Sequence, residues 1–301
     1  MPIALLPEDA VGKVTAVQPI STGLSGAGVW AVSSTRGELI LRVQAAEKGW
    51  AQHLRVLRRA AEAGVAPEVV HVDEEARAVV SRRAAGLPFA TALMDPGQRG
   101  AAIASLVAQL RTLHALDPTG VDERDPVAYA RAQLAAQRGR PGFPAWAADL
   151  EPVFAATEAT LAGNPRRVVS HNDVNPGNVV WDGTRAWLVD WEVAGLNHPF
   201  YDLATLAMFI QLDDPVAHAL LAQQEGHPID AAAGATFAAL RRLAALLCGL
   251  TFLGMVPDLS LVPDPAPTLS AFYADLRAGK LALQAPEGRA AFAAALLRAY
   301  S

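Results

Sequence analysis

The sequence predicts an α+β protein with two lobes, a small β-rich lobe at the N-terminus and a larger, mainly helical lobe after it. The first 85 or so residues show the patterns of short strands around a single helix. Most of the later chain is rich in alanine and leucine and has helical patterning, interrupted once by a short hairpin. We therefore predict two lobes, at residues 1–85 and 86–301.

Five strands and one helix are predicted in the N-terminal lobe. "KVTAVQPIST", "GVWAVSS" and "ELILRVQ" give three strands, and "PEVVHVDEEARAVVSRR" gives two more around an acidic turn. The segment "GWAQHLRVLRRAAEAG" has apolar residues at helical spacing. Gly64, at the end of this segment, is the stop signal of the helix.

Helices are predicted in the second lobe at residues 100–116, 127–138 and 147–162, and again from Tyr201 onward. The apolar pieces "NVVW" and "AWLVDW", separated by "DGT", predict the interrupting hairpin. The longest apolar run, "LAALLCGLTFLGMV", is too short to span a bilayer and predicts a buried core helix.

Net charge, cysteine content and the N-terminal sequence limit the partners and the compartment that we expect for this protein. The formal net charge of −5 gives no electrostatic reason to expect nucleic acid or an anionic membrane as a partner. A single cysteine, Cys248, excludes an internal disulfide framework and fits a reducing compartment. The N-terminus lacks the basic region of a signal peptide. We therefore expect a cytoplasmic protein; its oligomeric state is left open.

The polar residues of "HNDVNPGNVVWDGTRAWLVDW" exceed what a hairpin needs. Asp173 and Asn178 bracket the turn-prone "VNPG", and Asp190 ends the following strand. One amide and one carboxylate are oxygen ligands suited to Mg²⁺, and a second carboxylate can receive the proton of a hydroxyl nucleophile. Each residue alone could equally cap a turn. The set in this order indicates phosphoryl transfer.

Two features of the N-terminal lobe fit the same chemistry. The segment "STGLSGAGVWAV" contains Gly23, Ser25, Gly26 and Gly28, whose backbone N–H groups could bind phosphate oxygens, although a flexible hairpin turn is an equal alternative. Arg42 lies within the apolar strand "ELILRVQ", where a cation needs an anionic partner unless it is a solvated edge residue.

These motifs together resemble the aminoglycoside phosphotransferase and choline/ethanolamine kinase superfamily, a branch of the protein-kinase-like fold. "HNDVNPGN", "LVDWE" and "NHPFYDLA" carry the resemblance, and "GLSGAGVWAV", "LILRV" and "AAEAGVAPEVV" fall where the family has its nucleotide loop, third strand and N-lobe helix. The resemblance covers most of residues 15–210. "HND" and the strand arginine are closer to choline kinases than to antibiotic kinases.

The resemblance implies roles for matching residues. Asp173 would be the catalytic acid/base, Asn178 and Asp190 would hold Mg²⁺ against the ATP phosphates, and His171 would fix the catalytic loop. Nucleotide contacts would come from the glycine loop, from Arg42 in place of the usual lysine, and from the backbone around Arg82 and Ala84. Asp202 would anchor the loop. The residues that the resemblance suggests near the substrate are Glu192, Trp191, Tyr201 and Asp202.

The chain departs from the family pattern in three places. The N-lobe helix has His53 where relatives commonly have a glutamate that pairs with the strand base, so either another acid pairs with Arg42 or the pair is absent. His198 stands where relatives often have aspartate. The helix that would supply tryptophans to enclose choline offers Phe252 instead, which makes choline itself doubtful.

The sequence therefore predicts an ATP- and Mg²⁺-dependent kinase of a small-molecule hydroxyl. Amino alcohols lead as acceptors, followed by sugars, thiamine-like compounds and aminoglycosides. The alternative is a nucleotide-binding, pseudokinase-like sensor with little or no transfer activity, which the missing helix glutamate and the substituted lysine support.

Overall fold

The structure, a computed structural model of the chain, describes residues 2–20, 28–45, 49–147 and 149–300. The chain forms two compact units. Unit 1 comprises Met1–Glu123, Arg167–Asp202 and Gln223–Gly226; unit 2 comprises Arg124–Arg166, Leu203–Ala222 and His227–Ser301. The two lobes predicted from the change of sequence pattern near residue 85 are not these two units, and the boundary between the lobes remains a prediction.

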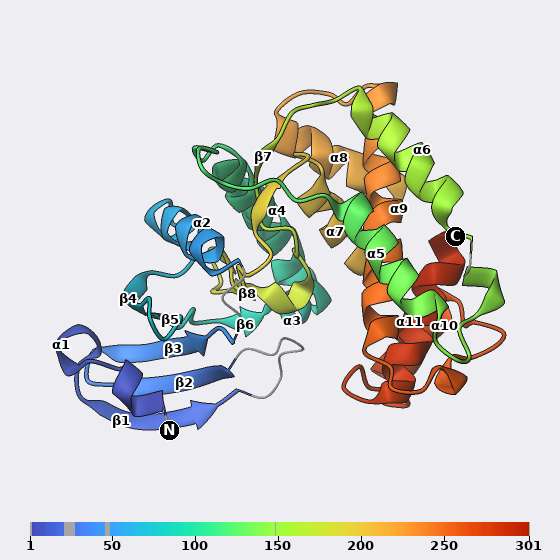
Figure 1. Cartoon of the computed structure of the whole chain (residues 1–301). Coiled ribbons are helices and arrows are strands. Elements are labelled where there is room, and N and C mark those ends of the chain that lie inside the picture. Colours follow the sequence, from blue (N-terminus) through green and yellow to red (C-terminus); the bar gives the residue numbers. More distant parts are fainter. Residues whose placement is uncertain (1, 21–27, 46–48, 148, 301) are drawn as a thin grey trace. The chain divides into compact units, whose positions relative to one another are not determined.

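An antiparallel sheet of five strands, in the order β1-β2-β3-β5-β4, forms the first part of unit 1 (Figure 1). Its strands are β1 (Val14–Pro19), β2 (Gly28–Ser34), β3 (Gly37–Val43), β4 (Val69–Asp73) and β5 (Ala78–Arg82). All five predicted strands are thereby confirmed. Arg42 pairs with Val29 on one side and Val79 on the other, so it lies in the centre of the sheet and is not a solvated edge residue.

The two faces of β3 differ as strand alternation requires. Leu39 and Leu41 are completely buried, in a cluster with Leu6 and Val11. The latter two come from the N-terminal segment that contains η1 (Pro2–Leu5) and α1 (Glu8–Val11). Ile40, Arg42 and Gln44 therefore share the opposite face.

The predicted helix of this region is α2 (Trp50–Glu62), which packs against β4. It begins after Gly49 and ends before Gly64, and both glycines have positive φ (84° and 71°). Beyond Gly64, the N–H of Val65 donates to the carbonyl of Ala60 at 2.8 Å, which satisfies a carbonyl of the last turn. The predicted stop signal is confirmed.

The remainder of unit 1 contains the polar run of residues 171–191 and the elements next to it. The long helix α4 (Pro96–His114) contacts two strands of this part, β7 (Val168–Ser170) and β9 (Ala186–Leu188). β9 pairs with β8 (Val179–Trp181), which confirms the predicted hairpin. The other elements are α3 (Phe89–Met94), η3 (Pro176–Asn178), β6 (Leu87–Pro88), which pairs with β8, and β10 (Gly195–Asn197), which pairs with β7.

Unit 2 is helical. Its elements are α5 (Pro126–Arg138), η2 (Ala145–Ala147), α6 (Glu151–Ala162), α7 (Tyr201–Phe209, except its first two residues), α8 (Asp214–Glu225, except its last three), α9 (Ala231–Gly254), η4 (Leu259–Leu261), α10 (Leu269–Arg277) and α11 (Pro286–Tyr300). The three helices predicted between residues 100 and 162 and the helices predicted after Tyr201 are confirmed.

Helix α9 is the centre of unit 2. It packs against α5, α6 and α11 and buries side chains along its whole length, for example Phe237 and Leu250. Its 24 residues are long and apolar enough to cross a membrane, but half of its most apolar window is buried inside the protein. This packing fits the buried core helix that the sequence predicts. The helix begins earlier than the apolar run "LAALLCGLTFLGMV" from which it was predicted.

A glycine fixes the connection between β5 and α3. Gly86 has φ of 137°, and a Cβ built there would lie 2.2 Å from the carbonyl oxygen of Trp181 in β8. Only a residue without a side chain allows the two backbones to approach this closely. Gly86 therefore lets the segment after β5 lie against the hairpin.

Replacing Gly86 by alanine should lower the free energy of unfolding by at least about 2 kcal/mol, because backbone strain and a steric clash add. Urea denaturation measures the effect. Gly183→Ala is the matched control, since Gly183 also has positive φ (97°) but no atom within 4 Å of a built Cβ. Equal losses in the two variants would contradict the assigned clash.

Candidate active site

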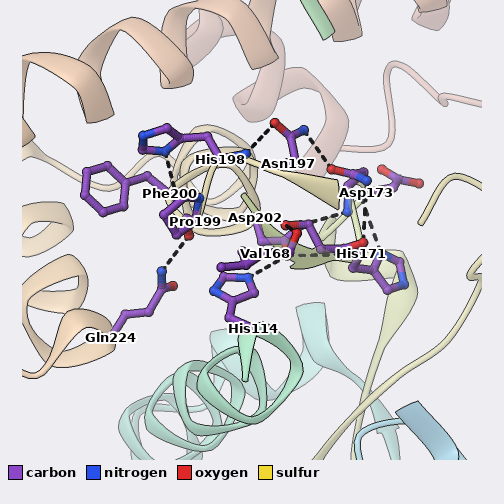
Figure 2. A network of polar contacts seen from close by, with 12 residues as sticks. His114, Val168, His171, Asp173, Asn197, His198, Pro199, Phe200, Asp202 and Gln224 are labelled. Atoms are coloured by element: carbon purple, nitrogen blue, oxygen red, sulfur yellow. Dashed lines mark hydrogen bonds and ion pairs between the residues drawn. The ribbon is translucent and has the colours of Figure 1, made fainter. Parts of the chain in front are cut away.

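The carboxylate of Asp202 is completely buried in the first turn of α7 and accepts three hydrogen bonds (Figure 2). Oδ2 accepts from the backbone N–H of His171 and from Nε2 of His114, both at 3.0 Å, and Oδ1 accepts from the N–H of Asn172 at 2.7 Å. Burial alone would raise the pKa of this carboxyl, but the hydrogen bonds from His114 and Asn172 outweigh burial and hold the pKa below its usual range. Asp202 is therefore an ionised residue that holds the backbone of the loop at His171 and Asn172.

The loop turns sharply at Asn172, which has φ of 68° in the left-handed region that asparagine tolerates better than most residues. Its side-chain nitrogen donates to the carbonyl oxygens of Val193 (3.1 Å) and Gly195 (3.3 Å), and its oxygen accepts from Asn197 at 2.8 Å. These bonds join the turn to the chain that follows Asp190.

His171 is completely buried, and both of its ring nitrogens are engaged. Nδ1 accepts from the N–H of Asp173 at 3.3 Å, and Nε2 donates to the carbonyl of Val189 at 2.9 Å. The ring also packs edge-on against Trp191, with centroids 4.7 Å apart. This environment fits a residue that holds the loop in place.

Asp173 and Asn178 are in direct contact. Nδ2 of Asn178 donates to carboxylate Oδ2 of Asp173 at 2.7 Å and to the carbonyl of Asp173 at 3.0 Å. Nδ2 of Asn175 donates to Oδ1 of the same carboxylate at 2.9 Å. Since the amide nitrogen of Asn178 faces Asp173, its carbonyl oxygen is the atom left to act as an acceptor or a metal ligand.

Asp190 lies at the same end of the hairpin as Asn178. The N–H of Val189 donates to the carbonyl of Asn178 at 2.9 Å, which continues the ladder of β8 and β9 by one step. Asp190 follows immediately and has φ of 69°, an uncommon conformation for a residue with a side chain. The hairpin therefore places the backbone of Asp190 at the same end as that of Asn178, and their joint role as metal ligands remains a prediction.

Arg42 is paired with two acids of this segment. Its Nη2 lies 2.5 Å from Oε2 of Glu192 and 3.0 Å from Oδ1 of Asp190. The arginine side chain is 15% exposed and the two carboxylates are 30% exposed, so the cluster is partly shielded from water. The acids that pair with Arg42 thus follow the hairpin and do not belong to α2.

The position on α2 where relatives commonly have glutamate is occupied by a neutral base. His53 is 2% exposed, and its Nδ1 contacts Oε1 of Gln44 at 3.0 Å. Burial, with a smaller contribution from the charge of Arg42, lowers the pKa of His53 to about 4. A neutral histidine cannot serve as a counter-ion, whereas Asp190 and Glu192 both pair with Arg42.

The sequence as a whole matches a known family. The model of the phosphotransferase enzyme family matches residues 16–246. The chain belongs to this family. The class of enzyme predicted from the motifs, a phosphotransferase, is thereby confirmed.

Solved structures agree with this membership. The phosphotransferase is similar to a choline/ethanolamine kinase family protein from Mesorhizobium loti, at 25% identity and a TM-score of 0.70 over 98% of this chain and 97% of that one. It is also similar to choline kinase LicA from Streptococcus pneumoniae (18% identity, TM-score 0.65, 99% and 96% of the chains) and to LicA in complex with AMP (17%, 0.64, 100% and 96%). The predicted kinase-like α+β fold is confirmed.

A shorter segment matches LicA of Haemophilus influenzae, with 39% identity over 51 residues, or 17% of the phosphotransferase. The match spans about a fifth (19%) of the length of that relative.

The other predicted nucleotide-binding residues are placed as follows. Gly23, Ser25 and Gly26 lie outside the described residues, and Gly28 begins β2 opposite Val43. The side chain of Arg82 contacts Glu68 and the carbonyl of Arg36 at the rim of the sheet. Ala84 lies in the connection between β5 and β6. Contact of these residues with a nucleotide remains a prediction.

Three of the four residues suggested near the substrate are buried. Trp191 is 2% exposed, Tyr201 4% and Asp202 0%. Contact of these residues with a substrate remains a prediction. Glu192 is the only one of the four that is partly accessible, and it pairs with Arg42. His198, which is 1% exposed, donates its N–H to Asn197 and packs against Phe200.

Sequence reasoning did not find several residues of the site. His114 ends a helix far from the motif, and Gln52 is a common polar residue without a distinctive pattern. Asn197 lies inside the quoted "NHPFYDLA", but the motif alone gave it no role. Their roles depend on contacts between distant segments, such as His114 with Asp202, 88 residues apart.

The low pKa of His53 predicts a pH-dependent stability. Its pKa in the folded state (about 4) lies below its ordinary value of 6.5, so the stabilisation is fully present above pH 6.5 and is lost as the pH falls toward 4. Between pH 7.5 and pH 5, wild type should lose about 2 kcal/mol more unfolding free energy than His53→Gln. Urea denaturation at both pH values checks this; parallel losses in the two proteins would refute it.

Proposed function

We propose that the chain transfers the γ-phosphoryl group of ATP to a hydroxyl group of a small molecule, with Mg²⁺ as the metal ion. The observation that carries the proposal is the contact of Asp173 with Asn178, beside Asp190 at the end of the same hairpin. One carboxylate for the acceptor hydroxyl and two oxygen ligands for a metal are what phosphoryl transfer needs.

Asp173 is the group suited to receive the acceptor proton. Its carboxylate is partly exposed and held by the amides of Asn175 and Asn178, so it is oriented before a substrate arrives. A hydroxyl that donates to this carboxylate would be aligned for attack on phosphorus, and its proton would pass to Asp173.

The residues present fit Mg²⁺ in their chemistry. Among the described residues, no three His, Cys, Asp or Glu side chains gather to hold a metal by themselves. The carbonyl oxygen of Asn178 and the carboxylate of Asp190 would hold an ion that takes its other ligands from phosphate and water, the usual arrangement for Mg²⁺. When bound, the ion would neutralise negative charge on the phosphates.

Arg42 would bind phosphate. Its guanidinium carries a permanent charge and has several N–H groups, of which Nη2 contacts the two carboxylates. The loop that contains Gly23 and Gly26 would add backbone N–H groups, by analogy with the family. The AMP bound to the similar LicA structure supports a nucleotide as the donor.

For the acceptor we propose an amino alcohol related to choline or ethanolamine, although the helix with Phe252 lacks the tryptophans that would enclose choline itself. The similarity to the choline/ethanolamine kinase family protein and to choline kinase LicA supports this class. Sugars, thiamine-like compounds and aminoglycosides are the alternatives, and a panel of these acceptors with Mg²⁺-ATP, assayed by ADP release, distinguishes them.

Asp173→Asn should lower kcat by roughly 1,000-fold, because the amide cannot accept the hydroxyl proton. Its affinity for nucleotide should stay near that of wild type. Asp182→Asn is a suitable control. Asp182 accepts hydrogen bonds in the turn between β8 and β9, so this substitution shows the effect of general damage to the hairpin. Nucleotide binding by wild type without turnover on any acceptor would instead favour the sensor.

A further inference from the structure

One buried glutamine connects helix α2 to the segment that follows Asp190. Gln52 is 4% exposed. Its Nε2 donates to the carbonyl oxygens of Ala194 at 3.1 Å and of Asp122 at 3.3 Å, while its Oε1 accepts from the N–H of Asp122 at 2.7 Å. Both side-chain N–H groups and the side-chain oxygen are thus used.

Ala194 closes the turn that contains Glu192, one of the two acids that pair with Arg42. The N–H of Ala194 donates to the carbonyl of Trp191 at 3.1 Å, so residues 191–194 form a tight turn with Glu192 inside it. A contact that holds the carbonyl of Ala194 therefore restricts where Glu192 can lie. Asn172 binds the neighbouring carbonyls of Val193 and Gly195, so the turn is held from two sides.

In protein kinases the acid that pairs with the third-strand base is supplied by the helix of the N-lobe, and the helix must be in place for activity. In this chain the helix supplies a neutral histidine at that position, and the acids come from the segment at 190–192. The helix still contributes through Gln52, one residue before His53.

We propose that Gln52 is a positioning residue of the phosphotransferase and that Glu192 is the counter-ion of Arg42, so that the two together replace the missing helix glutamate. Gln52 holds the turn at 191–194, the turn holds Glu192, and Glu192 with Asp190 holds the guanidinium of Arg42 for phosphate. This inference rests on the proposed function.

A purely structural role for Gln52 makes a different prediction. Helix α2 has further tethers on its other turns: Arg59 donates to the carbonyl oxygens of Asp117 at 2.7 Å and Thr119 at 2.9 Å. If Gln52 only attached the helix, its loss and the loss of Arg59 would have the same consequences. If Gln52 positions Glu192, only the loss of Gln52 should change nucleotide binding at the site.

The experiment compares Gln52→Met, Glu192→Gln, the double variant and the control Arg59→Met. Gln52→Met and Glu192→Gln should each raise the KM for Mg²⁺-ATP about tenfold, the effect of losing one polar contact, with a smaller change in kcat. The double variant should also stay near tenfold, because both substitutions break the same chain of contacts. Arg59→Met should leave this KM unchanged.

Amide hydrogen exchange gives a readout that does not require turnover. Gln52→Met should speed exchange at Val193, Ala194 and Gly195, and Arg59→Met should not. If Gln52→Met does not fold, Gln52→Glu serves instead, because it keeps the acceptor for the N–H of Asp122 and removes the donor to Ala194.

Additive effects in the double variant, or unchanged exchange at 193–195 in the Gln52 variants, would overturn the inference. Failure of the proposed function looks different, since wild type would then turn over no acceptor while the exchange data still report on the role of Gln52.

Discussion

The buried carboxylate of Asp202 is the constraint on which the candidate site depends. A carboxylate taken out of water needs donors, and here the donors are the backbone N–H groups of His171 and Asn172 together with His114. The cost of burying the charge is offset only if those backbone groups stay in place. The same bonds fix Asp173, the next residue, so a requirement of the core determines the position of the proposed acid/base.

The charges of the site form one compact cluster. Arg42 lies in the centre of the sheet, on the face opposite the apolar core, and is paired with Asp190 and Glu192. All three side chains are partly removed from water, so each charge is stabilised by the opposite charge beside it. Binding of a nucleotide with its metal would redistribute these contacts: phosphate competes with the acids for Arg42, and the metal competes with Arg42 for Asp190. Before a nucleotide binds, the contacts of Arg42 with Asp190 and Glu192 therefore hold these three side chains in place.

Much of this could be predicted from the sequence, and the reasons are physical. Strand alternation gave the faces of β3, and the glycine after α2 marked its end, because both depend on residues close together in the chain. The motif at 171–191 predicted a site at Asp173, Asn178 and Asp190 because these residues are close together in the chain, and their role in catalysis remains a prediction. The partners of Arg42 were left open because they lie 148 and 150 positions away, and Trp191 and Tyr201 could not be assigned to the interior before their burial was known. The cytoplasmic location remains a prediction.

The central claim is that Asp202 keeps the loop carrying Asp173 in its active geometry. Amide hydrogen exchange in Asp202→Asn, compared with wild type, tests it most directly. An asparagine cannot accept all three hydrogen bonds, so exchange at His171 and Asn172 should become about 100-fold faster, while the amides of β2 and β3 keep their protection. Unchanged protection at residues 171 and 172 would contradict the account.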